Sequence, residues 1–174
     1  STSAVNSEKE YKKIVFPLEK IEIILEDSIY IPTLNLSKSL INKLKSFATF
    51  ENPQIKTLLS LRKPLYNTPK YIRSFEENEN HLILPRGLKE QIVDFFNINA
   101  VDFSFVDKRY FKQIETKKVT FNLRPEQNDA IKEIKKTDLS ICVAPPGFGK
   151  TLLGAKIFEI RACSTIIVVN KNML

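Results

Sequence analysis

The chain has 174 residues, a length that suggests one or two domains with a buried core. Its 27 Lys and Arg against 20 Asp and Glu give a formal net charge of +7, which permits a nucleic-acid partner but does not establish one. The sequence has no apolar run of about eighteen residues and no secretory signal in residues 1–13, so we expect an intracellular protein, cytoplasmic or viral, without membrane association.

The N-terminal part predicts a small α+β accessory domain over residues 13–120. Residues 1–12 have low hydrophobicity and are expected to form a disordered tail. Alternating or continuous apolar residues, bounded by turn signals, predict the strands of the domain. The segments with this pattern are 21–25, 29–31, 71–75, 81–84, 101–105 and 117–121.

Helices are expected in the same domain where apolar residues recur at helical spacing. Residues 36–47 show this spacing, and Ser37 is a candidate N-cap. Asn52 followed by Pro53 is typical of an N-cap and a proline at the first helical position. A further helix is expected over residues 88–96.

The pattern changes near residue 121, and residues 121–174 predict the beginning of a second domain. A helix is expected over 124–136 and another over 150–160. Continuous apolar segments at 139–144 and 165–169 resemble strands of a parallel sheet that is covered on both faces. The order of strand, loop, helix and strand predicts one βαβ unit.

The loop inside this unit fits the phosphate-loop pattern, with alanine in place of the first glycine. Its residues are Ala144, Pro145, Pro146, Gly147, Phe148, Gly149, Lys150 and Thr151. Glycines allow backbone N–H groups to surround phosphate oxygens, and the following helix directs its positive end at the same anion. Lys150 is expected to reach the β- and γ-phosphates, and Thr151 to bind Mg²⁺. The alternative is a chance glycine turn, which the flanking strand and helix disfavour.

A second motif lies about twenty residues upstream of the loop and consists of Leu123, Arg124, Pro125, Glu126 and Gln127. The amide of Gln127 can pair with both the N6 donor and the N7 acceptor of adenine. Arg124 could contact the base or its phosphates. The alternative is a capped surface helix with a proline near its start, and the spacing to the phosphate loop favours adenine binding.

Together, Leu-Arg-Pro-x-Gln and Ala-Pro-x-Gly-x-Gly-Lys-Thr resemble the Q-type motif and motif I of superfamily 2 helicases, in the branch with the XPB-like and poxvirus transcript-release helicases. Residues 165–174 resemble the strand that enters motif Ia, with Asn170 and Lys171 in place of the more usual residues. The resemblance implies a truncated α/β RecA-like lobe after the accessory domain, with ATP and Mg²⁺ as cofactors. Pro146 stands where the family usually has threonine, and the Asp-Glu box and second lobe are expected downstream of Leu174.

The upstream sequence is similar to helicases of TOTE-type conflict systems, which accompany an archaeo-eukaryotic primase. The matching segments are Ala48 to Pro53, Lys63-Pro64 with Tyr71-Ile72, Leu84 to Gly87, and Asp107 to Arg109. This resemblance implies a nucleic-acid partner, expected to be DNA, and a primase or other replication or defence partner. The residues themselves leave DNA and RNA both open.

Basic residues are concentrated between Lys38 and Arg73, where Glu51 is the single acid. The candidates for nucleic-acid contact are Lys38, Lys43, Lys45, Arg62, Lys63, Lys70, Arg73 and, further on, Arg86. Interleaved aromatic residues can stack on bases while the cations neutralise phosphates. The alternative is that Phe47 and Phe50 belong to the core and the lysines form a solvated helix face.

The sequence therefore predicts the N-terminal portion of an ATP-dependent helicase or translocase, which couples hydrolysis to strand movement in the intact protein. The alternative to a helicase is a module that binds nucleic acid or a protein partner and does not hydrolyse ATP. A third possibility, another phosphate-loop enzyme such as a kinase, fits the loop but not Leu123 to Gln127.

Overall fold

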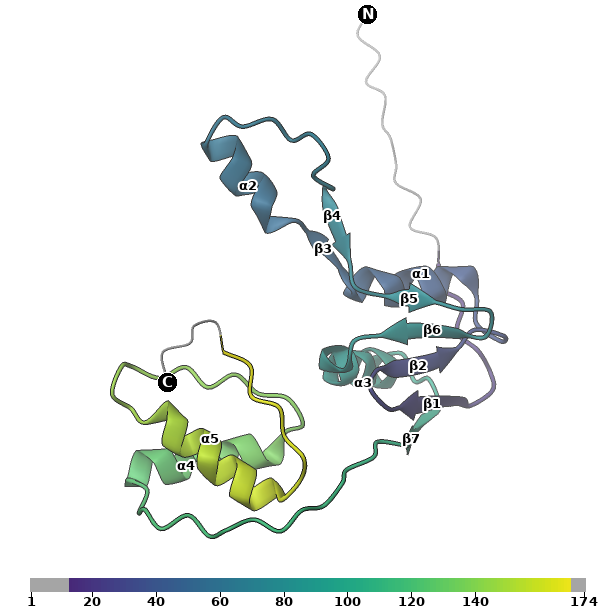
Figure 1. Cartoon of the computed structure of the whole chain (residues 1–174). Helices are drawn as coiled ribbons and strands as arrows, with labels where there is room; N and C mark the ends of the chain where they lie inside the picture. The colour runs from purple at the N-terminus through teal and green to yellow at the C-terminus, as the bar shows by residue number, and fades with distance from the viewer. Residues whose placement is uncertain (1–12, 170–174) are drawn as a thin grey trace, which may run out of the picture. The chain divides into compact units, whose positions relative to one another are not determined.

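The computed structural model describes residues 13–169, and its contacts divide the chain into two compact units (Figure 1). Unit 1 ends at Arg109 and unit 2 begins at Tyr110, so the division precedes the expected boundary at residue 120. The expected tail over residues 1–12 lies outside the described residues, as do Asn170 and Lys171. Within residues 13–169, no helix is long and apolar enough to cross a membrane.

Unit 1 contains a mixed five-stranded sheet with the order β5-β6-β2-β1-β7. Its strands are β1 (Ile21–Leu25), β2 (Ile29–Pro32), β5 (Glu76–Glu77), β6 (His81–Leu84) and β7 (Phe103–Asp107). The pair β1 and β7 is parallel, with Ile23 opposite Phe105, and the other pairs are antiparallel. The mixed α and β composition expected for this part of the chain is therefore present.

One face of this sheet is buried by two helices, α1 (Lys38–Phe47) and α3 (Lys89–Ile98), the latter preceded by the short 3₁₀ helix η1 (Arg86–Leu88). Alternate residues of the strands enter a single core, as the two-residue period of a strand requires. Leu44 and Phe96 are fully buried in the same core. Ser37 caps α1 as expected, because its Oγ accepts a hydrogen bond of 3.2 Å from the backbone N–H of Leu40.

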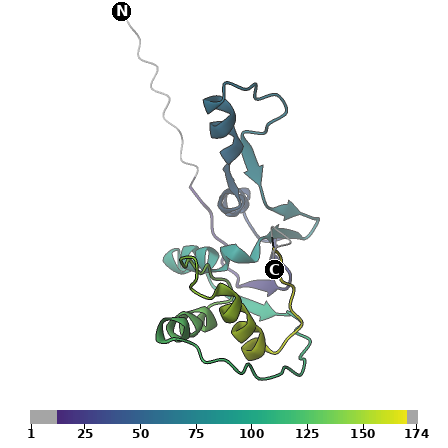
Figure 2. The ribbon, with the colours of Figure 1, turned by 60° about the vertical axis from the view of Figure 1, so that its left-hand side comes forward.

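A second, two-stranded sheet belongs to a segment that we call the arm, residues 49–73. The arm consists of β3 (Thr49–Glu51), α2 (Pro53–Ser60), a connecting segment over residues 61–70, and β4 (Tyr71–Arg73). It stands away from the five-stranded sheet of unit 1 (Figure 2). At its base, the backbone N–H of Ser74 donates to the carbonyl of Ala48 at 2.8 Å.

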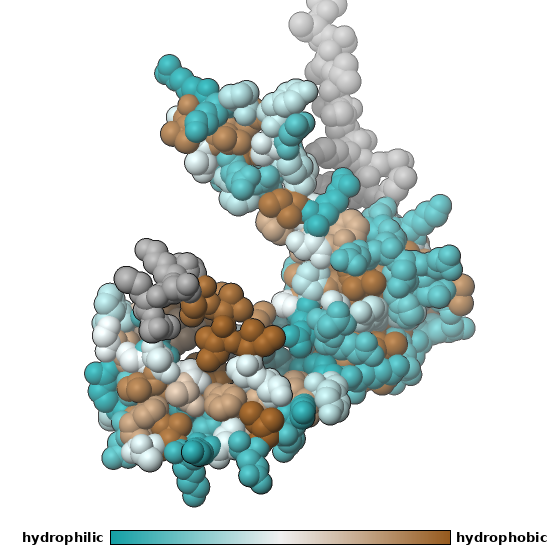
Figure 3. Space-filling model, viewed as in Figure 1, coloured by the Kyte–Doolittle hydropathy of each residue, from teal (hydrophilic) through white to brown (hydrophobic). Residues whose placement is uncertain are grey.

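Unit 2 contains two helices, α4 (Pro125–Lys136) and α5 (Lys150–Arg161), close to the expected bounds. The strands expected at 117–121, 139–144 and 165–169 are not formed, so these predictions are wrong for the described residues. The apolar side chains of the last two segments are instead exposed, for example Val143 by 92% and Ile166 by 90%. Hydrophobic patches are visible on the surface of unit 2 in Figure 3. The physical reason is that a strand needs ladder partners, and apolar sequence alone does not supply them.

The segment after Tyr110 is tied to the end of α5 by hydrogen bonds. The backbone N–H of Ile114 donates to the carbonyl of Ala162 at 2.9 Å. The carboxylate of Glu159 accepts from the N–H of Val119 at 3.2 Å and pairs with Lys156 at 2.9 Å. The hydrogen bond from Lys156 is the main cause that lowers the pKa of Glu159. These contacts belong to unit 2, although the sequence placed residues 110–120 in the accessory domain.

The last turn of unit 1 holds an ion pair that is testable by titration. Nη2 of Arg109 donates to Oδ2 of Asp107 at 2.6 Å, and hydrogen bonds from Arg109 lower the pKa of Asp107 from 3.8 to about 2. A lowered folded-state pKa stabilises the fold above the unfolded value of 3.8, and this contribution is lost as pH falls toward 2.

We expect Arg109→Ala to return the pKa of Asp107 toward 3.8, measured by NMR titration of its carboxyl carbon. Lys108→Ala is the control and should leave it near 2, whereas a wild-type midpoint of 3.8 would contradict this account.

Candidate nucleotide-binding site

The phosphate-loop residues lead directly into α5, and two of its glycines have backbone conformations that other residues rarely adopt. Gly147 has φ +76° and Gly149 has φ +90°, both in the left-handed region. Only glycine adopts this region without a steric cost from its side chain. The glycines expected from the sequence pattern are therefore required by the geometry of the loop.

Lys150 and Thr151 lie in the first turn of α5, and both are exposed. The N–H groups at the start of a helix have no intrahelical partners, so this end of α5 is a favourable place for an anion. Nζ of Lys150 donates to the carbonyls of Ala144 and Pro145, at 2.6 and 2.9 Å. The ammonium group is thus held across the start of the loop, where it bonds the loop's own backbone.

The upstream motif meets the phosphate loop at one atom, the carbonyl oxygen of Phe148. Nε2 of Gln127 donates to this oxygen at 2.7 Å, and Nη2 of Arg124 donates to it at 2.8 Å. The guanidinium of Arg124 also lies 5.8 Å from the centre of the Phe148 ring. The two motifs that the sequence singled out are therefore in direct contact. Sequence reasoning missed Phe148 as the meeting point, because a backbone carbonyl has no signature in the residue type.

Gln127 is held firmly at the start of α4. Its side chain is only 3% exposed, and Oε1 accepts a hydrogen bond of 2.8 Å from the backbone N–H of Arg124. A primary amide has two N–H donors and two acceptor lone pairs, so one of each remains after these bonds. A Cβ placed on Gly149 would lie 2.7 Å from Nε2 of Gln127. Glycine at 149 therefore also allows the loop to approach this amide closely.

The basic candidates of unit 1 fall into two groups with different surroundings. On α1, Nζ of Lys43 lies 5.0 Å from the centre of the Phe47 ring, and Lys45 pairs with Glu77 at 2.7 Å. Lys38, on α1, and Arg86, in η1, are exposed. The remaining candidates, Arg62, Lys63, Lys70 and Arg73, are exposed on the arm, together with Lys56, which the sequence reasoning did not select.

The alternative that Phe47 and Phe50 both belong to the core is correct for Phe47 and wrong for Phe50. Phe47 is partly buried and packs against the core of unit 1, where its ring centre lies 5.3 Å from that of Phe95. Phe50, on the arm, is 50% exposed. The helix α1 therefore uses its aromatic residue for packing, whereas the arm presents one to solvent.

Replacing Gly149 with alanine tests the contact between the loop and Gln127. We expect a cost of about 1–2 kcal/mol from the left-handed backbone and about 1 kcal/mol more because the amide of Gln127 must move and lose a hydrogen bond. Gly147→Ala is the matched control, since its φ is also positive but no atom lies within 4 Å of the added Cβ. Native-state hydrogen exchange of α5 amides measures both costs. Equal losses for the two variants would contradict the proposed contact.

Among solved structures, the chain is similar to the UvsW helicase from bacteriophage T4, with a TM-score of 0.52 and 20% sequence identity. The match covers 80% of this chain and 52% of that one, so the chain spans about half the length of the helicase it matches. No family model matches the sequence, and no curated protein matches it. The chain therefore shares a fold with the part of this helicase that it covers.

Proposed function

We propose that the intact protein is a superfamily 2 ATP-dependent helicase or translocase that binds ATP with Mg²⁺ and couples hydrolysis to movement along nucleic acid, with DNA as the proposed track. The convergence of Gln127 and Arg124 on the carbonyl of Phe148, at the N-terminus of α5, is the observation that carries this proposal. The fold shared with a phage helicase supports it. Because the chain covers 52% of that helicase, turnover is proposed for the whole protein and nucleotide binding for this chain.

The residues of the loop fit the phosphates of a nucleoside triphosphate. Two positive-φ glycines, the N-terminus of a twelve-residue helix, an ammonium group and a hydroxyl lie within one short segment. Lys150 exchanges its bonds to the carbonyls of Ala144 and Pro145 for bonds to the β- and γ-phosphates, and Thr151 binds Mg²⁺ through its hydroxyl. ATP with Mg²⁺ supplies the phosphoanhydride bond whose cleavage drives movement.

Adenine is proposed to bind at the start of α4. Gln127 retains one N–H and one lone pair beyond its bonds to Phe148 and Arg124, which complement N7 and the N6 amino group of adenine. Arg124 contacts the base or the phosphates. Because Gln127 also bonds the loop, a bound base and the phosphate-binding backbone are mechanically connected through the carbonyl of Phe148.

Further assignments rest on the sequence resemblance. We propose that unit 1 is the accessory domain expected over residues 13–120, and that unit 2 is the start of a RecA-like lobe of the XPB-like and poxvirus transcript-release branch. A relationship to TOTE-type helicases, with a primase or another replication or defence partner, is proposed on the same basis. In this arrangement, unit 1 provides contact with nucleic acid and unit 2 binds the nucleotide.

Lys150→Ala tests phosphate binding. Loss of a charge-assisted bond of about 1.5–3 kcal/mol corresponds to about a 10- to 100-fold lower affinity for a fluorescent ATP analogue with Mg²⁺. Nucleic-acid-stimulated ATP hydrolysis by the whole protein should be lost. Lys156→Ala is the matched control on the same helix, because Lys156 pairs with Glu159. An ATPase activity of Lys150→Ala equal to that of the wild type would refute the proposed site.

Gln127→Ala tests adenine recognition separately from the structural bond to Phe148. Weaker bonding within the loop should lower the affinity for ATP and GTP alike, whereas loss of base recognition should lower only the affinity for ATP. We expect the preference for ATP over GTP to fall about five-fold or more, since a good bidentate pair contributes about 1–3 kcal/mol of discrimination. Competition binding with both nucleotides measures this ratio. An unchanged ratio would limit Gln127 to its structural bond.

A further inference from the structure

The arm carries a strongly basic surface that the nucleotide site does not use. Its five cations are Lys56, Arg62, Lys63, Lys70 and Arg73, and its single acid is Glu51. All five cations are exposed, and none forms an ion pair with a carboxylate of the described residues. Lys45 of α1, in contrast, is already paired with Glu77. The positive charge of the arm is therefore available to an anionic partner.

Aromatic rings accompany these cations at the surface. Tyr66 is 86% exposed, Phe50 50% and Tyr71 46%. Nζ of Lys70 lies 5.3 Å from the centre of the Tyr71 ring, so a cation and a ring occupy the same part of the surface. Thr49 is opposite Arg73 and Glu51 is opposite Tyr71, so Tyr71, Arg73 and Glu51 share one face of the two-stranded sheet, and Phe50, opposite Ile72, lies on the other.

Hydrogen bonds from a buried residue hold the arm in one conformation. Asn52 is 5% exposed; its Oδ1 caps α2 by accepting from the N–H of Gln54 at 3.0 Å, and its Nδ2 donates to the carbonyl of Pro69 at 3.1 Å. Its backbone N–H donates to the carbonyl of Lys70 at 2.9 Å. Asn52 thus joins the beginning of α2 to the returning chain at Pro69 and Lys70.

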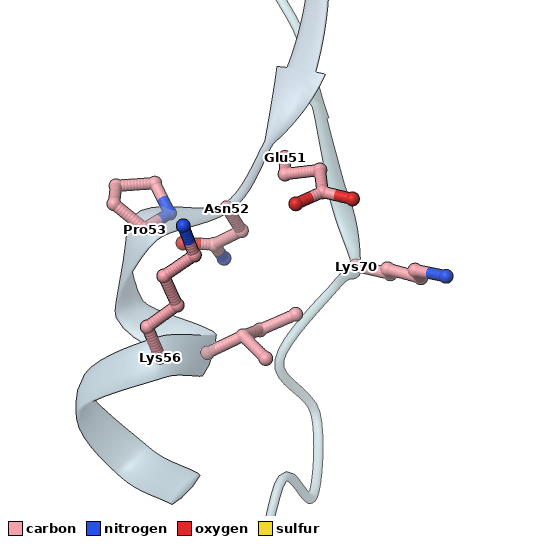
Figure 4. A pocket seen from close by; sticks show the side chains of 6 residues that line it. Glu51, Asn52, Pro53, Lys56 and Lys70 are labelled. Carbon is pink, nitrogen blue, oxygen red and sulfur yellow. The ribbon is translucent and has the colours of Figure 1, made fainter. Parts of the chain in front are cut away.

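A pocket of about 180 Å³ lies beside this connection (Figure 4). It is lined by Glu51, Asn52, Pro53, Ile55, Lys56 and Lys70. Lys56 comes from α2, and Lys70 from the segment that leads into β4. The side chain of Lys70 points away from the other lining residues (Figure 4), and Lys70 is exposed.

The end of α2 has an arginine where glycine is usual. The N–H of Arg62 donates to the carbonyl of Leu59 at 3.0 Å, and that of Lys63 donates to Leu58 at 2.9 Å, the pattern of a Schellman motif. Arg62 has φ +52°, a conformation that favours glycine. Ala100 and Ala162 have similar positive φ values near the ends of α3 and α5, so this conformation recurs at helix ends of the chain.

We propose that the arm binds single-stranded nucleic acid, with its cations on the phosphates and with Tyr66 and Tyr71 stacked on bases. Cations alone would serve for a duplex, but exposed rings add affinity only where base faces are accessible, as in a single strand. The choice of nucleic acid as partner rests on the proposed helicase function, and the stacking follows from the arm itself. DNA and RNA share this phosphate and base chemistry.

The test uses the full chain without nucleotide, and fluorescence anisotropy with fluorescein-labelled twelve-base oligo-dU and oligo-rU, which differ only in the sugar. Tyr66→Ala should lower the affinity about five-fold or more, as expected for loss of one stacked base. Arg62→Gly should lower the affinity and reduce the slope of log K against log salt by about 0.7, as expected for one lost phosphate contact. The same variant should raise the melting temperature, because glycine relieves the positive φ, so weaker binding cannot result from unfolding.

Lys132→Ala is the matched control, since Lys132 is an exposed cation on α4 outside the arm. It should bind both oligonucleotides as the wild type does. Because the assay contains no nucleotide, failure of the ATP site does not change its outcome. The tighter of the two oligonucleotides identifies the preferred sugar. Wild-type affinity of Arg62→Gly and Tyr66→Ala would overturn the proposal, as would an equal loss in Lys132→Ala or tighter binding of a matched duplex.

Discussion

The carbonyl oxygen of Phe148 is the acceptor on which the organisation of unit 2 depends. Gln127 and Arg124 both donate to it, which ties the start of α4 to the loop before α5. The close approach of Gly149 to the same amide leaves no room for a side chain, so the loop, the helix N-terminus and the buried glutamine form one assembly. A ligand that moves the loop must also disturb Gln127, so the proposed binding of a nucleotide would have a direct structural consequence.

The two units divide the proposed work. Unit 2 presents a helix N-terminus with an ammonium group and a hydroxyl, which suits a triphosphate with Mg²⁺. Unit 1 encloses its own apolar core and presents the arm, on which five cations and the rings of Phe50, Tyr66 and Tyr71 are exposed. The distribution of the net charge of +7 is therefore more informative than its size. On α1, Lys43 packs over the ring of Phe47 and Lys45 pairs with Glu77, whereas the cations of the arm form no ion pair with a described carboxylate.

Features encoded locally were predictable from the sequence, and features that depend on distant partners were not. Ser37 and Asn52 cap the helices that they were expected to cap, because a cap involves only neighbouring residues. The apolar segment at 139–144 has the composition of a buried strand, but pairing requires neighbours that sequence composition does not specify. The sequence likewise could not distinguish Lys45, which is paired, from Lys70, which is exposed, since both lie in the same basic stretch.

The most direct measurement is an NMR titration of the ¹⁵N-labelled chain with ATP and Mg²⁺. The account predicts the largest chemical-shift changes at the backbone amides of Gly147 and Gly149 and, at the same nucleotide concentration, at the side-chain amide of Gln127. A single binding curve for all three would show that base, loop and helix respond together. Changes confined to other residues, or loop changes that leave the Gln127 amide unaffected, would contradict the claim that this glutamine links adenine to the phosphate loop.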